Sequence, residues 1–378
     1  MPEGYDPGRY DIVFWQNIPS LHQAPLMRAL ASDLGKRVLI VAAEDLPEDR
    51  RAMGWADIDF GEADLIVEPS VDERLELVEG NRDAAAHVFS GLNAYPAVSH
   101  AMATLARGRH NHIAIITEPW DSRGLGGWLR AIKFALRRRS LQHIDTVFAC
   151  GVMAGKQLIS LGYDPGKIAA FGYFVSGPTE KRRVQTSGDP RLVFVGTFTE
   201  WKNPGILLQA LAMTPSNAWE LTMIGDGPLR ADTIQKAKDL NLSHRVSFVR
   251  SMTNETVLNL IAASDLLVLP SKYDGWGAVV SEALMAGTPV VVTQACGASD
   301  LVRSALQGEV IEPAKLTELA RALDSRFGSS PVTDESRARL RCWANTAISP
   351  RAAAEYLWET VGRDDRAKIS MAPWVSIE

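Results

Sequence analysis

Cysteine is scarce in this chain of 378 residues, and its three cysteines, Cys150, Cys296 and Cys342, do not have the spacing of metal ligands. A disulfide framework is therefore excluded, and a reducing compartment is expected. No uninterrupted apolar run approaches the roughly 18 residues that a membrane-spanning helix needs, and the polar residues 1–11 carry no signal-peptide core. We expect a cytoplasmic protein, or one peripheral to the inner face of the plasma membrane.

Positive charge is also lacking, because the formal net charge is -5, which argues against general nucleic-acid binding. No Gly-x-Gly-x-x-Gly follows the first apolar run, which argues against a nicotinamide-dependent oxidoreductase. What is present is an ordinary soluble composition in a chain long enough for two domains.

Apolar runs alternate with amphipathic stretches through the first half of the chain. The expected strands are 12–14, 37–42, 64–67, 84–89, 112–117 and 144–149, the expected helices are 23–34, 96–107 and 151–161, and 168–174 leads out of this half. Such alternation predicts a parallel sheet with helices on both faces, whose ligands bind beyond the carboxyl ends of the strands.

Residues 176–190 are polar, rich in turn formers and without apolar period, as a linker is. The strand pattern then resumes. The expected strands are 192–195, 221–224, 246–249, 266–269 and 290–292, and the expected helices are 205–212, 253–263, 278–286 and 350–362. The prediction is an α/β chain of two Rossmann-like, doubly wound domains, 1–175 and 191–349, with 350–378 as a terminal helix and tail.

The most informative stretch is 264–293, which reads as strand, glycine-rich loop, helix, turn and strand. The loop 274–277 leads into the helix, so several backbone N–H groups and the positive end of a helix dipole point at one spot. A phosphate is the natural occupant of such a spot. Glu282 follows Asp274 by eight residues, about two turns along.

This stretch resembles the E-x7-E segment of glycosyltransferase family 4, the retaining enzymes of the GT-B fold. Asp274 stands at the first Glu position, Glu282 at the second, and the string EALMAGTPVV continues the likeness. The resemblance implies that the first carboxylate contacts hydroxyls of the donor sugar and the second holds the ribose. The backbone amides that would meet the sugar and distal phosphate are those of Gly275, Trp276, Gly277 and Ala278.

Three further segments resemble donor-binding segments of that family. Gly196, Thr197 and Lys202 match its G-R-x-x-x-x-K segment, with Thr197 where an Arg that neutralises the diphosphate is expected. The turn Gly225, Asp226 and Gly227 matches one lying close to the diphosphate and nucleoside, and Arg250, Ser251 and Met252 stand where the nucleobase is placed. Arg250 or the loop amides are the alternatives for replacing the missing Arg.

In the first half of the chain the resemblance extends only to the architecture. We expect the residues that contact the acceptor to lie in the loops that follow the strands. Glu118 directly follows one strand and is a candidate for an acceptor hydroxyl; the alternative is an ordinary surface Glu. Gln16, Asn17 and His22 in the first loop are further candidates for acceptor binding. His110 and His112 lie at the opposite strand end, and we interpret them as surface residues rather than a metal pair.

Residues 126–142 combine apolar positions at helical spacing with five basic residues. A basic amphipathic helix of this kind can lie on an anionic membrane surface. The alternative is a helix packed on the sheet with a solvated basic end.

The resemblance implies a retaining, hexosyltransferase-type glycosyltransferase that moves a sugar from a UDP- or GDP-linked donor to an acceptor hydroxyl. Its catalytic residues would be Lys202, Asp274, Glu282 and Glu118. No cofactor or metal is expected, and the acceptor would belong to bacterial surface polysaccharide or lipid-linked glycan synthesis. The alternatives are a non-catalytic nucleotide-sugar-binding subunit and a nucleotide-sugar epimerase of the same build.

Overall fold

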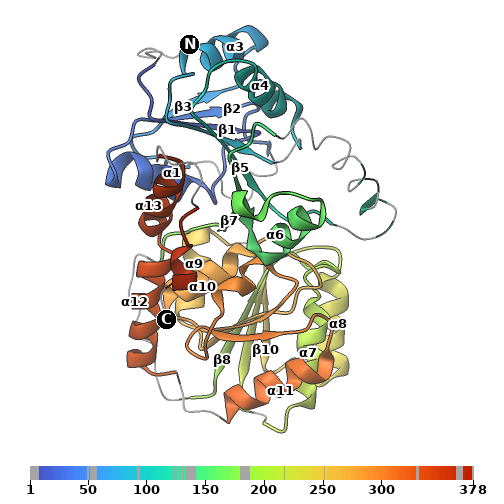
Figure 1. Ribbon diagram of the computed structural model, residues 1–378. Helices are drawn as coiled ribbons and strands as arrows, with labels where there is room; N and C mark the ends of the chain where they lie inside the picture. The colour runs from blue at the N-terminus through green and yellow to red at the C-terminus, as the bar shows by residue number, and fades with distance from the viewer. Residues whose placement is uncertain are drawn as a thin grey trace. The chain divides into compact units, whose positions relative to one another are not determined.

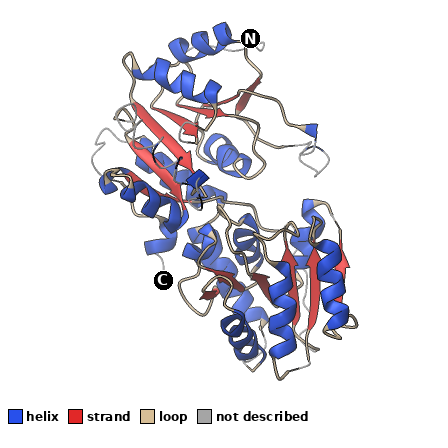
Figure 2. Ribbon diagram, turned by 90° about the vertical axis from the view of Figure 1, so that its right-hand side faces the viewer, coloured by secondary structure: helices blue, strands red, loops and turns tan. Residues whose placement is uncertain are grey.

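The computed structural model divides into two compact units, Met1–Phe174 with Pro350–Glu378, and Val175–Ser349 (Figure 1). Each unit is a parallel sheet with helices on both faces (Figure 2). The structure describes residues 8–48, 51, 58–91, 94–121, 124, 126, 127, 129, 132, 142–178, 188–216, 218–250, 252–328, 332–362 and 369–376.

Seven strands form the sheet of the first unit, in the order β3-β2-β1-β4-β5-β6-β7. They are β1 (Ile12–Gln16), β2 (Val38–Ala42), β3 (Asp64–Val67), β4 (Ala86–Ser90), β5 (His112–Thr117), β6 (Thr146–Cys150) and β7 (Ile168–Phe171). Every residue of β1, β2, β5 and β6 is buried. Continuous apolar runs predict this burial, because helices cover both faces of a parallel sheet.

The helices of the first unit lie on the two faces of that sheet. They are α1 (Ala24–Arg28), the π-helical η1 (Ala29–Asp33), α3 (Val71–Gly80), α4 (Pro96–Ala106), α6 (Gly151–Ser160), η4 (Pro165–Lys167), α13 (Pro350–Val361) and α14 (Pro373–Ser376). Helices α3 and α4 pack on each other, whereas α13 packs on α1 and η1 (Figure 1).

Buried aromatic rings attach the C-terminal segment to β6 and β7. The rings in mutual contact are those of Phe148, Phe171, Phe174, Tyr356 and Trp374. The Tyr356 hydroxyl also donates to the carbonyl of Ala170 at 3.1 Å. The terminal helix α13 and the short α14 therefore belong to the core of the first unit, although they follow the second unit in the chain.

Six strands form the sheet of the second unit, in the order β10-β9-β8-β11-β12-β13. The strands are β8 (Arg191–Val195), β9 (Glu220–Ile224), β10 (Val246–Val249), β11 (Leu266–Leu269), β12 (Val290–Thr293) and β13 (Gly308–Ile311). The helices are α7 (Pro204–Met213), α8 (Arg230–Asp239), α9 (Asn254–Ala262), α10 (Ala278–Ala286), η5 (Gly297–Leu301), α11 (Leu316–Phe327) and α12 (Asp334–Ala347). Helix α7 packs with α8 and α11, and α10 packs with α9 and α12 (Figure 1).

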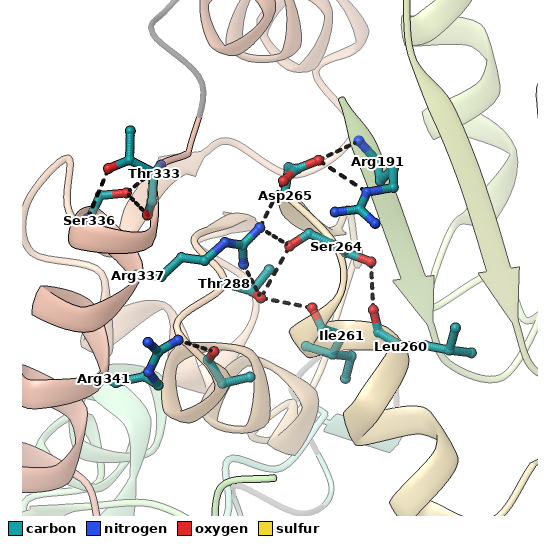
Figure 3. A network of polar contacts seen from close by, with 11 residues as sticks. Arg191, Leu260, Ile261, Ser264, Asp265, Thr288, Thr333, Ser336, Arg337 and Arg341 are labelled. Atoms are coloured by element: carbon teal, nitrogen blue, oxygen red, sulfur yellow. Dashed lines mark hydrogen bonds and ion pairs between the residues drawn. The ribbon is translucent and has the colours of Figure 1, made fainter. Parts of the chain in front are cut away.

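A buried arginine on α12 ties the helices around α10 to the sheet (Figure 3). The Arg337 guanidinium donates to the Ser264 carbonyl at 2.7 Å and pairs with Asp265 at 2.8 Å. It also reaches the Thr288 hydroxyl at 3.3 Å, just beyond the end of α10. Its side chain is 2% exposed. The network fixes the start of β11 and the end of α10, the two elements that flank the 274–277 loop.

The structure departs from the expectations in several places. His112 is buried and bonds the Thr146 hydroxyl at 2.9 Å, so its interpretation as a surface residue is wrong. The helix expected over 23–34 changes from α-helical to π-helical at Ala29. Helices α3, α11, α12 and α14 and strand β13 were not among the expected elements. The basic helix over 126–142 lies largely outside the described residues, as does most of the 176–190 linker.

Candidate functional site

The centre of the second sheet is a point where the chain reverses its direction of winding. From β8 the chain adds β9 and β10 on one side, and β11, β12 and β13 follow on the other. Ligands of open α/β sheets bind outside the carboxyl ends of the strands at such a point. Lys202 lies in the loop after β8 and Asp274 in the loop after β11, so these residues flank it.

Lys202 and Asp274 form an ion pair. The Lys202 ammonium donates a hydrogen bond to Oδ2 of Asp274, and the two side chains are 23% and 11% exposed. The pair joins two predicted site residues from different loops. It also holds a cation and a carboxylate at the carboxyl edge of the central strands, where both side chains are largely shielded from water.

The loop from Asp274 to Gly277 is fixed by the segment that follows β12. The Asp274 amide donates to the Ala295 carbonyl at 3.0 Å, and the Cys296 thiol donates to the Trp276 carbonyl at 2.8 Å. Gly277 has a left-handed φ of 83°, and a Cβ there would lie 2.5 Å from the Cys296 sulfur. Only glycine fits this position, so the loop has one tight conformation.

Open backbone N–H groups are concentrated in this loop and at the start of α10. Among the described residues, the amides of Gly275, Trp276, Gly277 and Ala278 donate no hydrogen bond to a backbone carbonyl outside α10, and no side chain caps the start of that helix. Helix α10 begins at Ala278, so the positive end of its dipole is at the same place. Such an arrangement binds anions, and phosphate groups above all.

Glu282 lies on α10, one turn beyond these amides. Its side chain is 8% exposed, and burial raises the pKa of its carboxyl to about 7. A carboxyl group with this pKa is divided between protonated and ionised forms near neutral pH. It can therefore donate or accept a hydrogen bond with a ligand hydroxyl at little cost.

The loops after β8 and β9 pack against each other. The Phe198 amide donates to the Asp226 carbonyl at 2.9 Å, and Gly196 donates to the Ile224 carbonyl at 3.0 Å. A Cβ on Gly225 would overlap the carbonyl oxygen of Gly196, and one on Gly227 would lie 2.7 Å from that of Phe198. The glycines of the G-D-G turn are therefore required for this close approach.

Arg250 extends from the end of β10 toward the same turn. Its Nε lies 3.7 Å from Oδ2 of Asp226, and the two side chains are 72% and 54% exposed. Thr197 is exposed, and Met252 is half-buried. Ser251 lies outside the described residues. The structure thus brings Lys202, Asp226 and Arg250 to one edge of the sheet, and places the sites predicted from three separate motifs next to each other.

The candidates in the first unit lie at the carboxyl edge of its sheet. Glu118 is exposed after β5 and accepts a hydrogen bond from the Tyr173 hydroxyl. The ring of His22, in the loop after β1, stacks on the Tyr173 ring at a centroid distance of 5.8 Å. Gln16 is buried and donates to Gln23 at 2.6 Å, and Asn17 donates to Glu44 at 3.4 Å. Glu118 and His22 are thus brought together through one residue, whereas Gln16 supports the loop from within.

Tyr173 is a site residue that the sequence analysis did not identify. The sequence shows 168–174 only as a segment leading out of the first half, whereas β7 covers Ile168–Phe171 and Tyr173 follows it. The preceding Gly172 was the available signal, because glycine in a strand pattern marks a break and the residues after a strand end lie at the ligand edge.

The described part of the chain holds neither a membrane-spanning helix nor a cluster of metal ligands. No helix in the described ranges is long and apolar enough to cross a membrane. Within the same ranges, no three His, Cys, Asp or Glu side chains are grouped so as to hold a metal ion.

Comparison with known proteins finds a matching family model and several curated relatives. The family model described as glycosyl transferases group 1 matches residues 178–341. A D-inositol 3-phosphate glycosyltransferase of Mycobacterium sp. (strain KMS) is 28% identical over 197 residues, covering 48% of this chain and 44% of that protein. A 2-deoxystreptamine glucosyltransferase of Streptomyces kanamyceticus is 28% identical over 217 residues, covering 54% and 56%. The chain thus spans about half the length of these curated relatives.

Solved structures share the fold over nearly the whole chain. The crystal structure of Anabaena HepE in complex with UDP aligns with a TM-score of 0.69 at 17% identity, covering 93% of this chain and 99% of that one. Sucrose-phosphate synthase from Thermosynechococcus elongatus aligns with a TM-score of 0.63 at 17% identity, covering 92% and 98%. The two Rossmann-like units therefore have the GT-B fold, as predicted, and the second carries the sequence pattern of the glycosyl transferases group 1.

Proposed function

We propose that this protein is a retaining glycosyltransferase of family 4 that moves a hexosyl group from a nucleotide diphosphate sugar to an acceptor hydroxyl. The observation that carries the proposal is the Lys202–Asp274 pair beside the open amides that precede α10. A cation and several N–H donors serve a diphosphate, and a neighbouring carboxylate serves sugar hydroxyls.

Each donor-site residue then has a role that its position supports. Lys202 and the amides of residues 275–278 hold the diphosphate, with the turn 225–227 and Gly196 close by. Asp274 accepts hydrogen bonds from the sugar, and Glu282 from the ribose. Arg250, Ser251 and Met252 line the nucleoside side. The donor is UDP- or GDP-linked, and the solved structure that contains UDP supports this class.

The reaction breaks the bond between the anomeric carbon and the distal phosphate oxygen. The departing diphosphate takes the bonding electrons, and Lys202 with the loop amides stabilises its growing negative charge. The acceptor oxygen attacks from the face that the diphosphate leaves, and its proton passes to the leaving phosphate oxygen. Because a lysine and a helix end take the diphosphate charge, the proposed reaction needs no metal.

The acceptor is proposed to bind at the carboxyl edge of the first sheet, where Glu118 and His22 meet hydroxyl groups and Gln16 and Asn17 shape the loop. The two curated relatives are named for D-inositol 3-phosphate and 2-deoxystreptamine, so cyclitols belong in the first acceptor screen. A bacterial surface polysaccharide or lipid-linked glycan acceptor, reached by a peripheral cytoplasmic protein through the basic segment 126–142, is the second arm of the same proposal.

A thermal-shift screen of UDP, GDP, ADP and their sugars tests the proposal, because a ligand that binds the folded state raises the melting temperature. We expect one diphosphate and its sugar to stabilise the protein, with and without EDTA. A protein indifferent to every sugar nucleotide offered would contradict the proposal.

Two alternatives share this donor site and are separated by product analysis. A non-catalytic binding subunit is excluded when the wild-type protein consumes the donor and the Lys202→Ala variant does not. A nucleotide-sugar epimerase releases a free sugar isomer, whereas the transferase gives a glycosylated acceptor, which mass spectrometry distinguishes.

A further inference from the structure

Tyr173 lies where the ends of several neighbouring strands of the first sheet converge. It follows β7, and the residues that touch or electrostatically influence it come from the loops after β1, β4 and β5 and from the last position of β6. These residues are His22, Tyr95, Glu118 and Cys150. The strands concerned are adjacent in the sheet, in the order β1-β4-β5-β6-β7. The winding reverses between β1 and β4, so this is the ligand-binding edge of the first unit.

The Tyr173 hydroxyl acts as a hydrogen-bond donor to Glu118. Burial, and then the neighbouring Cys150 and Glu118, raise the pKa of Tyr173 well above its usual value, so the hydroxyl keeps its proton. That proton is donated to Oε1 of Glu118. A phenol has a single O–H, so the hydrogen bond fixes which carboxylate oxygen faces the tyrosine.

The surroundings hold the tyrosine ring as well as its hydroxyl. His22 stacks on it with an interplanar angle of 22°. Tyr173 is half-buried, whereas Glu118 is exposed at the strand end. An exposed carboxylate is therefore held by a partly buried partner. Such support is what an exposed carboxylate needs to meet a reacting group in one geometry.

We propose that Tyr173 is a positioning residue that orients the Glu118 carboxylate toward the hydroxyl of the acceptor. The assignment rests on the proposed glycosyl transfer and deepens it by naming the device that prepares the acceptor side. Tyr173 keeps its proton throughout, Glu118 accepts a hydrogen bond from the acceptor O–H, and no bond to either residue is made or broken.

A double-mutant cycle tests this assignment. The variants are Tyr173→Phe, Glu118→Ala and the double variant, and Phe keeps the ring that His22 covers. The rate of nucleoside diphosphate release is measured with water as the acceptor. The donor is whichever of UDP-glucose, UDP-N-acetylglucosamine and GDP-mannose gives the largest thermal shift with the wild-type protein.

We expect Tyr173→Phe to lower kcat about ten-fold with an unchanged KM for the donor, and the double variant to be no slower than Glu118→Ala alone. If Tyr173 has only a structural role, the kcat losses of the two single variants multiply in the double variant, or Tyr173→Phe lowers the melting temperature. Tyr163→Phe is the matched control, since Tyr163 is another tyrosine of the first unit and its buried hydroxyl has no hydrogen-bond partner among the described residues. It should leave kcat unchanged.

The outcomes separate this assignment from the proposed function. An active wild-type enzyme whose Tyr173→Phe variant keeps the full kcat, or whose double variant shows multiplied losses, overturns the assignment alone. A wild-type protein that neither binds nor consumes any of the three donors overturns the proposed function, and the assignment with it.

Discussion

Lys202 and Asp274 are separated by 72 positions in the sequence, yet each is the other's ion-pair partner. In the proposed complex this contact is exchanged for two others, from the ammonium to the diphosphate and from the carboxylate to the sugar. The pair keeps both side chains oriented and their charges balanced before the donor arrives. A half-buried cation without such a partner is costly.

Replacing Lys202 by Ala should raise the Kd for the preferred nucleoside diphosphate about ten- to a hundred-fold, the worth of one charged hydrogen bond. Lys272→Ala is the matched control. Lys272 is exposed in the loop after β11, and its backbone amide donates to the Trp201 carbonyl at 2.7 Å. Titration calorimetry measures the Kd of each variant. Equal losses of affinity in the two variants would contradict a specific contact and indicate a general effect of removing one positive charge.

Glu282 makes the stability of the protein depend on pH. Its pKa of about 7 in the folded protein lies above the ordinary Glu value of 4.5, so its contribution to stability is fully present below pH 4.5 and is lost as pH rises through 7. The free energy of unfolding falls by about 3 kcal/mol over this range, because each unit of pKa difference corresponds to roughly 1.4 kcal/mol. We therefore expect the melting temperature of the wild type, relative to Glu282→Gln, to fall between pH 5 and 8. Parallel curves for the two proteins would contradict this role of burial.

At the scale of elements, the close packing of the loops after β8 and β9 depends on glycine. Gly225 has a φ of 138° and would place a Cβ against the carbonyl of Gly196. Gly188 has a similar φ of 149°, with nothing within 4 Å of its Cβ position. Alanine substitutions at the two positions share the strain of a positive φ, but only the one at Gly225 adds steric overlap.

Gly225→Ala should destabilise the protein by about 1–3 kcal/mol more than Gly188→Ala does, the usual cost of overpacking. The variant should also bind the nucleoside diphosphate more weakly, because the turn beside Asp226 must shift. Urea unfolding of both variants measures the first effect. Equal free energies of unfolding would mean that the two loops separate without cost.

The strands and most helices could be predicted because their signals are local. Helix α10 was expected over 278–286 and is found there, since Gly277 and Gly287 mark its ends and apolar residues fill it. Helix α9 was expected over 253–263 and is found at Asn254–Ala262, with the Thr253 hydroxyl accepting from the Thr256 amide at its start. Helix α14 could not be predicted, because Trp374 is buried by Phe174 and Tyr356, which are distant in the sequence.

The candidate site was predictable only as separate motifs. The loop glycines and the residues after each strand could be identified from the sequence, but the contact between Lys202 and Asp274 arises from the strand order. The burial of Glu282 depends on everything that packs on α10, and no spacing shows it. His112 was misjudged for the same reason, because its partner Thr146 lies on the neighbouring strand.

At the scale of the whole molecule, the proposal makes a stereochemical prediction. A front-side displacement retains the configuration at the anomeric carbon, so an α-linked donor should give an α-linked product. Proton NMR of the glycoside formed in the acceptor screen reports the anomer, and repeating the reaction in EDTA tests independence from metal. A β-linked product would contradict the retaining assignment.

The central claim is that Lys202 and the amides preceding α10 form a diphosphate site at the reversal point of the second sheet. The most direct measurement is a crystal structure of the protein with the nucleoside diphosphate that gives the largest thermal shift. We predict two phosphates in contact with Lys202 and the amides of residues 275–278, and a ribose at Glu282. A diphosphate bound elsewhere, with the Lys202–Asp274 pair undisturbed, would contradict the claim.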